Sequence, residues 1–392
     1  MRFGIERSFR RIMPALVLFL CAALSSALGQ QRTPNDNLRS PEVNPQGRVT
    51  FRLYAAEAQH VRLQAEGRDA TPGITPEQLK SESERSDMSK GADGIWSIQI
   101  GPIQPGVYRY TFLVDAVQTT DPRNPLSSES LNFVRSMYEV PGAPFLEYRA
   151  DVPHGAIASV WYESAPVGGL RRMHVYTPPG YEHDDRNYPV LYLLHGGGDT
   201  DDSWSTVGRA GAILDNLIAE HRAVPMIVVM PAGHISRDFQ LRTGQNTMGH
   251  DKFNDDLTGT VIPYVDKNYR TVADRDHRAL AGLSMGGLQT LDISLSRSDL
   301  FAYIGVFSSG WFSEMREQEE RTDLTQYKGS GQPFKLYWVG VGKYDIANAN
   351  SAATVSLLKK YGVAPAAKET GGYHAWTNWR DYLREFAAEI FR

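Results

Sequence analysis

The sequence predicts an α/β protein with a mostly parallel central sheet, preceded by a small all-β sandwich. Two observations support this fold class. Residues 47–117 contain short runs in which apolar and polar residues alternate without helical periodicity, as in half-buried strands. From about Tyr148, continuous apolar runs alternate with amphipathic stretches, as expected for strands buried between two layers of helices.

The N-terminus has the pattern of a secretory signal peptide. Four arginines precede an apolar segment, residues 13–29, whose small final residues favour cleavage near 27–29. This segment is shorter than the roughly 20 apolar residues of a membrane span. Cys21, the only cysteine, would leave with the signal peptide (residues 1–29), or would carry a lipid if the protein were a lipoprotein. The residues before Cys21 are poor for a lipoprotein signal, so we expect a secreted or periplasmic protein.

The all-β part follows a short leader. Residues 30–45 are polar and contain three prolines, and we expect them to be flexible. In the sandwich, residues 46–140, we expect pairs of strands within 47–67 and 94–117 and a loop in the polar stretch 67–90. Short strands of this kind predict an immunoglobulin-like sandwich. It contains no candidate catalytic group, so we expect it to pack against the second domain or to contact polysaccharide.

The α/β domain is predicted to span residues 148–392. Its continuous apolar runs predict strands within 171–177, 188–198, 224–233, 277–284, 301–309 and 334–342. Its amphipathic stretches predict helices within 210–221, 253–269, 286–296, 350–362 and 376–391. This alternation is the pattern of a parallel sheet with helices on both faces.

Residues 282–286, Gly-Leu-Ser-Met-Gly, match the pattern G-x-S-x-G where a predicted strand meets a predicted helix. In the nucleophile elbow of the α/β-hydrolase fold, such a sequence exposes a serine on a sharp turn. Glycines beside the serine let the strand and helix pack closely, and the free N–H groups of the helix N-terminus suit a developing negative charge. An ordinary glycine turn is the alternative. The strand–turn–helix context favours Ser284 as a nucleophile.

A serine nucleophile needs a base and an acid that orients it. In α/β-hydrolases the acid and then the histidine follow the serine along the chain. His374 is the only histidine after Ser284 and lies in a glycine-rich stretch before the last predicted helix. Asp345 directly follows a predicted strand, where the acid is expected, although it could instead cap the next helix. Other acids are in less suitable positions, inside a helix, at its end or in a charged loop: Asp292, Asp299 and Asp323.

An oxyanion hole needs two N–H donors. One is expected from Met285, the residue after the nucleophile, and the other from the loop after an early strand. Gly197 and Gly198 in "LLHGGG" can bring such a loop close to a substrate carbonyl. His195 precedes Ser284 and is out of order for the base, so we expect it to have a structural role.

Charge and composition exclude several classes of function. The chain has 41 Lys and Arg and 45 Asp and Glu residues, a formal charge of −4, which gives no sign of a nucleic-acid-binding protein. His250 and Asp251 are adjacent but no spaced set of ligands accompanies them, so we predict no metal site and no cofactor.

Several motifs taken together resemble the esterases related to feruloyl esterases of carbohydrate esterase family 1 and to enterochelin esterases. These motifs are "YPVLYLLHGGG", "VVMPAG", "VIPYVDKNYRT", "AGLSMGG", "GVGKYD" and "GYHAWTNWRDYL". The resemblance covers about Tyr148 to Arg392 and implies the α/β-hydrolase fold. It also implies Ser284 as nucleophile, Asp345 as acid and His374 as base. Residues 47–117 resemble the early-set domain, similar to carbohydrate-binding module 48, that often precedes such esterases.

The resemblance and the signal peptide together favour a secreted serine esterase that releases ferulate or related hydroxycinnamates from plant xylan through an acyl-enzyme. Alternatives are an acetyl-xylan esterase, an enterochelin-type siderophore esterase, or an inert carbohydrate-binding protein. Trp204, Trp311 and Trp376 are candidates for an aromatic substrate clamp, with a place in the core as the alternative.

Overall fold

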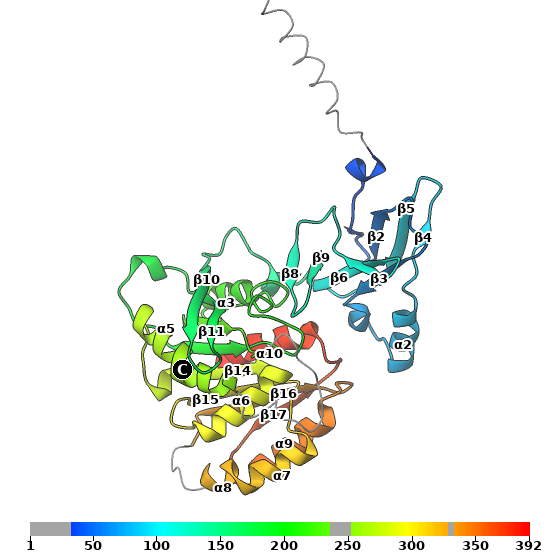
Figure 1. Ribbon diagram of the computed structural model, residues 1–392. Coiled ribbons are helices and arrows are strands. Elements are labelled where there is room, and N and C mark those ends of the chain that lie inside the picture. Colours follow the sequence, from blue (N-terminus) through cyan, green and yellow to red (C-terminus); the bar gives the residue numbers. More distant parts are fainter. Residues whose placement is uncertain (1–32, 236–251, 328–332) are drawn as a thin grey trace, which may run out of the picture.

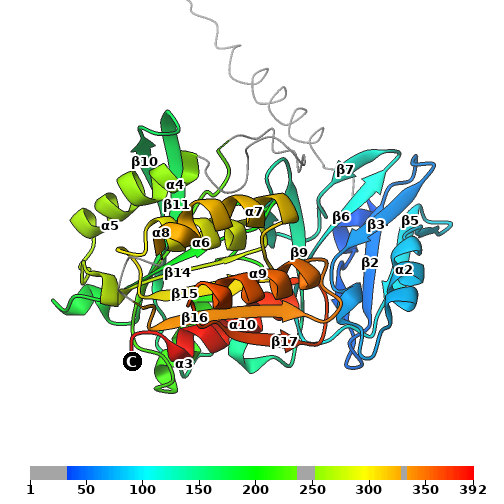
Figure 2. The same ribbon diagram turned by 90° about the horizontal axis from the view of Figure 1, so that it is seen from below.

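The structure is a computed structural model that describes residues 33–235, 252–327 and 333–392 (Figure 1). The predicted signal peptide with Cys21, and the pair His250 and Asp251, lie outside the described residues. Two parts lie side by side in both views (Figures 1 and 2): two antiparallel sheets from the N-terminal third of the chain, and a larger α/β part. No helix of the described residues is long and apolar enough to cross a membrane.

The first part, here called the N-terminal sheets, consists of two antiparallel sheets around one core. One sheet has the order β1-β2-β5-β4, and the other has the order β3-β6-β9-β8 with β7 beside β6. Their bounds are β1 Glu42–Val43, β2 Val49–Tyr54, β3 Val61–Ala65, β4 Ser89–Lys90, β5 Ile95–Ile100, β6 Gly106–Val114, β7 Val117–Thr119, β8 Ser127–Glu129 and β9 Val134–Val140. Phe51 of one sheet packs against Tyr110 and Tyr138 of the other, with ring centroids 4.7 and 5.3 Å apart. The strands within 47–67 and 94–117 are confirmed, whereas the immunoglobulin-like assignment stays a prediction.

Two expectations for this region are wrong. The leader contains a 3₁₀ helix, Pro34–Asn37, and the strand β1, which pairs with β2. The stretch 67–90, expected to be a loop, contains a short 3₁₀ helix, Arg68–Ala70, and the helix α2, Pro76–Glu84. Thr75 caps α2, because its hydroxyl accepts from the Gln78 N–H while the Gln78 side chain accepts from the Thr75 N–H. No residue of α2 is buried, so no apolar periodicity could reveal it.

The α/β part is built on an eight-stranded sheet with the order β10-β11-β13-β12-β14-β15-β16-β17. The strands are β10 Ala156–Ser164, β11 Gly169–Thr177, β12 Val190–Leu194, β13 Ile227–Pro231, β14 Arg278–Leu283, β15 Tyr303–Phe307, β16 Leu336–Gly342 and β17 Ala366–Thr370. β10 and β11 are antiparallel to their neighbours, and all other pairs are parallel. The predicted mostly parallel sheet is therefore confirmed. The edge strand β17 escaped prediction because its side chains are mostly exposed.

Helices cover both faces of this sheet (Figure 2). One face packs against α3, Ala210–Ala219, and α10, Trp376–Glu389. The other face packs against α4 Lys252–Asp256, a short π-helix Leu257–Val261, α5 Ile262–Asn268, α6 Met285–Ser296, α8 Asp323–Tyr327 and α9 Asn348–Lys360. The helix α7, Ser313–Arg321, lies next to α8 and α9. Successive residues of each central strand point to opposite cores, which explains their continuous apolar runs.

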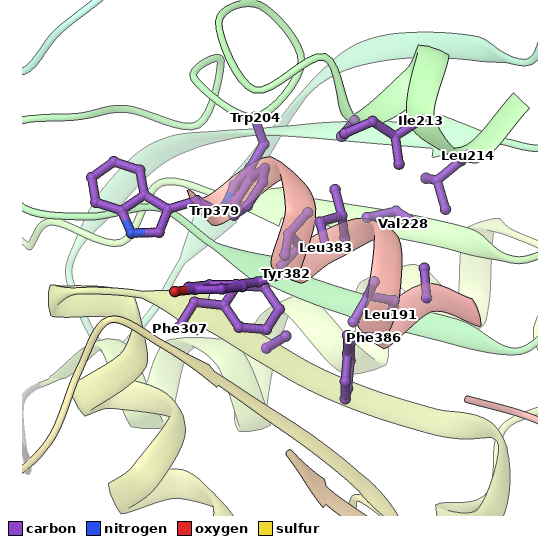
Figure 3. Packing of buried hydrophobic residues seen from close by; sticks show 14 of the residues in the cluster. Leu191, Trp204, Ile213, Leu214, Val228, Phe307, Trp379, Tyr382, Leu383 and Phe386 are labelled. Atoms are coloured by element: carbon purple, nitrogen blue, oxygen red, sulfur yellow. The ribbon is translucent and has the colours of Figure 1, made fainter. Parts of the chain in front are cut away.

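The core under α10 continues into the N-terminal sheets. It contains Val107 of β6 and Met137 of β9 together with the side chains of α10 that Figure 3 shows against the central strands. Arg380 of α10 is fully buried, and its guanidinium donates to the Val107 carbonyl oxygen at 2.6 Å and to the Val207 carbonyl oxygen at 3.1 Å. The hydrogen bond from Arg380 to Val107 is therefore a buried link between the two parts.

Candidate active site

Ser284 lies on a sharp turn between β14, which ends at Leu283, and α6, which begins at Met285. Its backbone has φ 51° and ψ −112°, a conformation that non-glycine residues rarely adopt. Neighbouring strands hold it, because the Ser284 N–H donates to the Phe307 carbonyl at 2.9 Å and the Ser309 hydroxyl donates to the Ser284 carbonyl at 2.8 Å. The turn thus presents the serine side chain at the end of the sheet.

The glycines on either side of Ser284 are required by close backbone contacts. A Cβ atom on Gly282 would lie 2.3 Å from the Gly286 carbonyl oxygen. A Cβ atom on Gly286 would lie 2.5 Å from the His195 carbonyl oxygen and 2.7 Å from the Leu194 Cβ. All three distances are far below van der Waals contact, so a larger residue at either position would force the surrounding backbone to move.

We expect Gly286→Ala to lower the free energy of unfolding by about 1–3 kcal/mol, because the added methyl group must push backbone rather than a flexible side chain. Esterase activity should also fall, since His195 directly precedes the loop that faces Ser284. Urea unfolding and initial rates measure the two effects. Gly259→Ala is the matched control, because a Cβ atom there meets no neighbour within 4 Å. Equal stability of the two variants would contradict the close-packing argument.

Three predicted side chains form one chain of hydrogen bonds. The His374 Nε2 lies 2.9 Å from the Ser284 Oγ, and the His374 Nδ1 lies 2.8 Å from the Asp345 Oδ1. Ser284, Asp345 and His374 follow the carboxyl ends of β14, β16 and β17, which lie at the same edge of the sheet. The structure therefore brings together residues that are up to 90 positions apart in the sequence.

Asp345 is held in its charged form. Its side chain is fully buried, and its Oδ1 accepts from the Ala347 N–H at 2.8 Å as well as facing His374. Burial alone would raise the pKa of this carboxyl, but the hydrogen bond to His374, the charge of that imidazole and the Ala347 N–H together lower the pKa below its ordinary value. An ionised carboxylate is what is needed to orient the imidazole and stabilise its protonated form.

The predicted oxyanion donors lie beside Ser284. Gly197 and Gly198 line the same cavity as Ser284, and Met285 begins α6 directly after it. The loop comes so close that a Cβ atom on Gly196 would lie 3.4 Å from the Ser284 Cβ. The placement of these residues matches the prediction, and their role as donors stays a prediction.

His195 ties this loop to its surroundings, as expected for a structural residue. Its Nδ1 lies 2.9 Å from the Gly196 carbonyl oxygen, and its Nε2 accepts from the Gly233 N–H at 2.8 Å. Burial lowers the pKa of His195, which keeps the imidazole neutral and its Nε2 able to accept. The Gln289 amide of α6 donates to the Gly233 carbonyl at 3.0 Å and completes the link.

A cavity of about 400 Å³ opens above Ser284, and the N-terminal sheets form one of its walls. The α/β part contributes Ser284, His374, the glycine loop and several aromatic rings, among them Trp376. The N-terminal sheets and the segment after β3 contribute Glu66, Asp69, Tyr108, Arg109 and Arg135. Sequence reasoning missed this wall. The available signal was Arg109, a charged residue within the otherwise apolar and aromatic run of β6.

Of the three tryptophans proposed for a substrate clamp, only Trp376 lines the cavity. Trp204 is 1% exposed and packs in the core under α10, where its Nε1 donates to the Leu194 carbonyl (Figure 3). Trp311 is fully buried on the other face of the sheet, where its Nε1 donates to the Asp292 carboxylate at 2.6 Å. The clamp is therefore wrong for Trp204 and Trp311, whose rings lie in the hydrophobic cores.

Comparison with known proteins agrees with this geometry. Residues 164–390 match the model of the esterase family, whose description is "Putative esterase". The chain belongs to this esterase family. The α/β part described above is thus the esterase domain, and the match begins at the end of β10 and ends just after α10.

One relative of this esterase-family chain is the endo-1,4-beta-xylanase/feruloyl esterase of Xylanibacter ruminicola. The two are 33% identical over 363 residues, which is 90% of this chain and 46% of the relative. Endo-1,4-beta-xylanase Y of Acetivibrio thermocellus is 28% identical over 207 residues, 49% of this chain and 18% of that protein. The chain therefore spans less than half the length of these relatives.

Solved structures share the fold. The ferulic acid esterase of the anaerobic fungus Anaeromyces mucronatus, 24% identical, superposes with a TM-score of 0.56 over 64% of this chain and 96% of its own. The enterobactin esterase of Shigella flexneri, 17% identical, superposes with a TM-score of 0.60 over 90% of this chain and 97% of its own. These likenesses support the predicted α/β-hydrolase fold.

Within residues 33–235, 252–327 and 333–392, no three His, Cys, Asp or Glu side chains are grouped so that they could hold a metal ion.

Proposed function

We propose that this protein is a serine carboxylic-ester hydrolase that acts through an acyl-enzyme on Ser284. The observation that supports this most strongly is the hydrogen-bonded chain from Asp345 through His374 to the Ser284 Oγ. A serine hydroxyl is a poor nucleophile unless a base removes its proton, and the His374 Nε2 lies within hydrogen-bond distance of the Ser284 Oγ.

In the proposed reaction, the Ser284 Oγ attacks the ester carbonyl carbon while its proton passes to the His374 Nε2. The negative charge on the carbonyl oxygen is stabilised by backbone N–H groups of Met285 and of Gly197 or Gly198. The protonated His374 then gives its proton to the departing alcohol, and the acyl group remains on Ser284. Water, activated by His374, releases the acid and restores the enzyme.

For the substrate, we propose hydroxycinnamoyl esters such as ferulate on plant xylan. The xylanase/feruloyl esterase of Xylanibacter ruminicola is similar along 90% of this chain, which supports this choice. The cavity is also suited to an aromatic acyl group or a sugar. Tyr344 directly precedes Asp345, and Tyr373 directly precedes His374. The two tyrosine rings line the cavity together with Trp376, and they stack with their centroids 5.3 Å apart.

A second candidate is an enterochelin-type siderophore esterase. The enterobactin esterase of Shigella flexneri matches the fold of 90% of this chain, which includes the N-terminal sheets. An acetyl-xylan esterase is a third candidate from the sequence. We also propose that residues 46–140 form an early-set domain similar to carbohydrate-binding module 48, that it contacts polysaccharide, and that the signal peptide directs the protein out of the cytoplasm.

Hydrolysis rates for methyl ferulate, acetylated xylan and enterobactin test these choices. We expect the highest kcat/KM for methyl ferulate and release of ferulate from feruloylated xylan. Faster hydrolysis of the acetyl ester or of enterobactin would replace the proposed substrate class. Absence of activity towards these esters and towards a p-nitrophenyl ester would favour an inert carbohydrate-binding protein.

A further inference from the structure

The loop that faces Ser284 is held from outside the esterase domain. This loop, residues 196–202, is called the glycine loop here. The Leu131 N–H, between β8 and β9, donates to the Gly198 carbonyl at 2.9 Å. The Glu129 N–H donates to the Asp202 carboxylate, with distances of 3.1 and 3.2 Å to its two oxygens. The Arg109 Nη1 of β6 donates to the Asp199 Oδ1 at 2.6 Å. All three contacts come from the N-terminal sheets.

The contact between Arg109 and Asp199 is buried and charged. Each side chain is only 7% exposed, and Glu66 takes a second Arg109 nitrogen at 2.8 Å. Burial alone would lower the pKa of the Arg109 guanidinium, but the charges of Glu66 and Asp199 raise the pKa above its usual range. Arg109 is therefore always charged, and loss of Arg109 would leave the buried Asp199 carboxylate without this cation.

The glycine loop has little internal packing at its key position. Gly198 has φ 81°, and a Cβ atom on it would meet no neighbour within 4 Å. Within the loop, the Asp199 N–H donates to the Gly196 carbonyl at 3.2 Å, which closes a turn but does not place that turn relative to Ser284. Contacts within the esterase domain hold the two ends of the loop, since His195 contacts the Gly196 carbonyl and Arg172 of β11 donates to the Asp201 carboxylate at 2.7 and 3.0 Å. The middle of the loop, at Gly198 and Asp199, is held by the N-terminal sheets.

From this geometry we propose that Arg109 is a positioning residue for ester hydrolysis. Through Asp199, it fixes the glycine loop at the distance from Ser284 at which the Gly197 or Gly198 N–H can stabilise the oxyanion. The inference rests on the proposed function, since it assigns a task within that reaction. A donor stabilises the transition state only if it is already in place when charge develops.

The test is Arg109→Met in the full chain, assayed on p-nitrophenyl acetate and on methyl ferulate. We expect kcat to fall about 10- to 100-fold, somewhat less than for complete removal of one oxyanion donor. The KM for p-nitrophenyl acetate should change little, because this small ester needs no contact with Arg109. Hydrogen exchange at residues 196–202 should become faster.

Arg209→Met is the matched control. Arg209 forms an ion pair of similar length with Glu139, 2.7 Å, between the esterase domain and the N-terminal sheets, but it does not touch the glycine loop or line the cavity. We expect its kcat to stay close to that of the unchanged protein. An equal loss in both variants would show that general docking of the two parts, and not the loop, is affected, which would overturn the proposal.

The double variant Arg109→Met, Asp199→Asn separates positioning from charge compensation. It removes the ion pair between residues 109 and 199 without leaving a buried Asp199 carboxylate unpaired. It can also be assayed if Arg109→Met alone does not fold. We expect the double variant to regain stability in urea unfolding but not kcat. Recovery of kcat together with stability would overturn the proposal, as would a loss confined to KM in Arg109→Met. If the unchanged protein hydrolyses no ester, the proposed function fails. Hydrogen exchange at residues 196–202 would still test whether Arg109 holds the glycine loop.

Discussion

Ser284→Ala lowers the hydrolysis rate of a p-nitrophenyl ester by a factor of about a thousand or more, while the protein stays folded. The large effect is expected because members of a hydrogen-bonded triad act as a unit, so that removal of the nucleophile leaves only the residual catalysis of the oxyanion hole and of binding. Stability should change by about 1 kcal/mol or less, since the substitution removes one partly exposed hydroxyl and its hydrogen bond to His374.

A fluorophosphonate probe provides an independent measurement. It should label the unchanged protein at Ser284 and should not label the variant, and peptide mass spectrometry identifies the site. Ser309→Ala is a useful control, because its hydroxyl supports the Ser284 carbonyl but does not contact His374. Labelling at another serine, or a Ser284→Ala variant close to full activity, would refute the assignment.

Asp345→Asn should lower kcat at neutral pH by about 10⁴-fold with the fold retained. The carboxamide cannot balance the charge of protonated His374, and it favours the wrong tautomer of the imidazole. Because the folded-state pKa of Asp345 lies below its ordinary value, the carboxylate stays ionised in weakly acidic solution. Loss of wild-type activity on mild acidification is therefore not expected to come from protonation of Asp345.

The same shift determines how stability depends on pH. A depressed folded-state pKa means that Asp345 stabilises the fold above its unfolded-state pKa and loses this contribution as the pH falls through the folded-state pKa. The stability difference between the unchanged protein and Asp345→Asn should therefore be present at pH 7 and shrink in strong acid. Asp299→Asn is the control, because Asp299 is an exposed aspartate that follows α6. If Asp345→Asn keeps its activity while Asp299→Asn loses it, the acid is misassigned.

The predictable parts of this molecule are those encoded by neighbouring residues. The elbow at Ser284 was predictable because its strand, turn and helix are contiguous, and the glycines that its close contacts require stand on both sides of it. Asp345 and His374 were predictable from their order along the chain and from their positions after strands. The strands of the large sheet were predictable because burial on both faces makes their sequences continuously apolar.

Features that depend on long-range contacts or on weak local patterns were not predictable. α2 has a capping box but no buried face, so only its ends carried a signal. Arg109 meets Asp199 across 90 residues, and an alternating pattern cannot show which strand faces the active site. Trp204 and Trp311 were misjudged because a tryptophan near a motif has the same sequence appearance whether it lines a cavity or fills a core.

The buried guanidinium of Arg380 also has a consequence for the order of folding. Its partner Val107 lies 273 residues earlier in the chain, one of the longest sequence separations in the structure. During synthesis the residues of the N-terminal sheets emerge long before those of α10, whereas His374 emerges together with that helix. Closing such a large loop is slow, since its entropy is lost before its contacts form. We therefore expect the nascent protein to complete its cavity only after α10 has been synthesised and has docked onto β6.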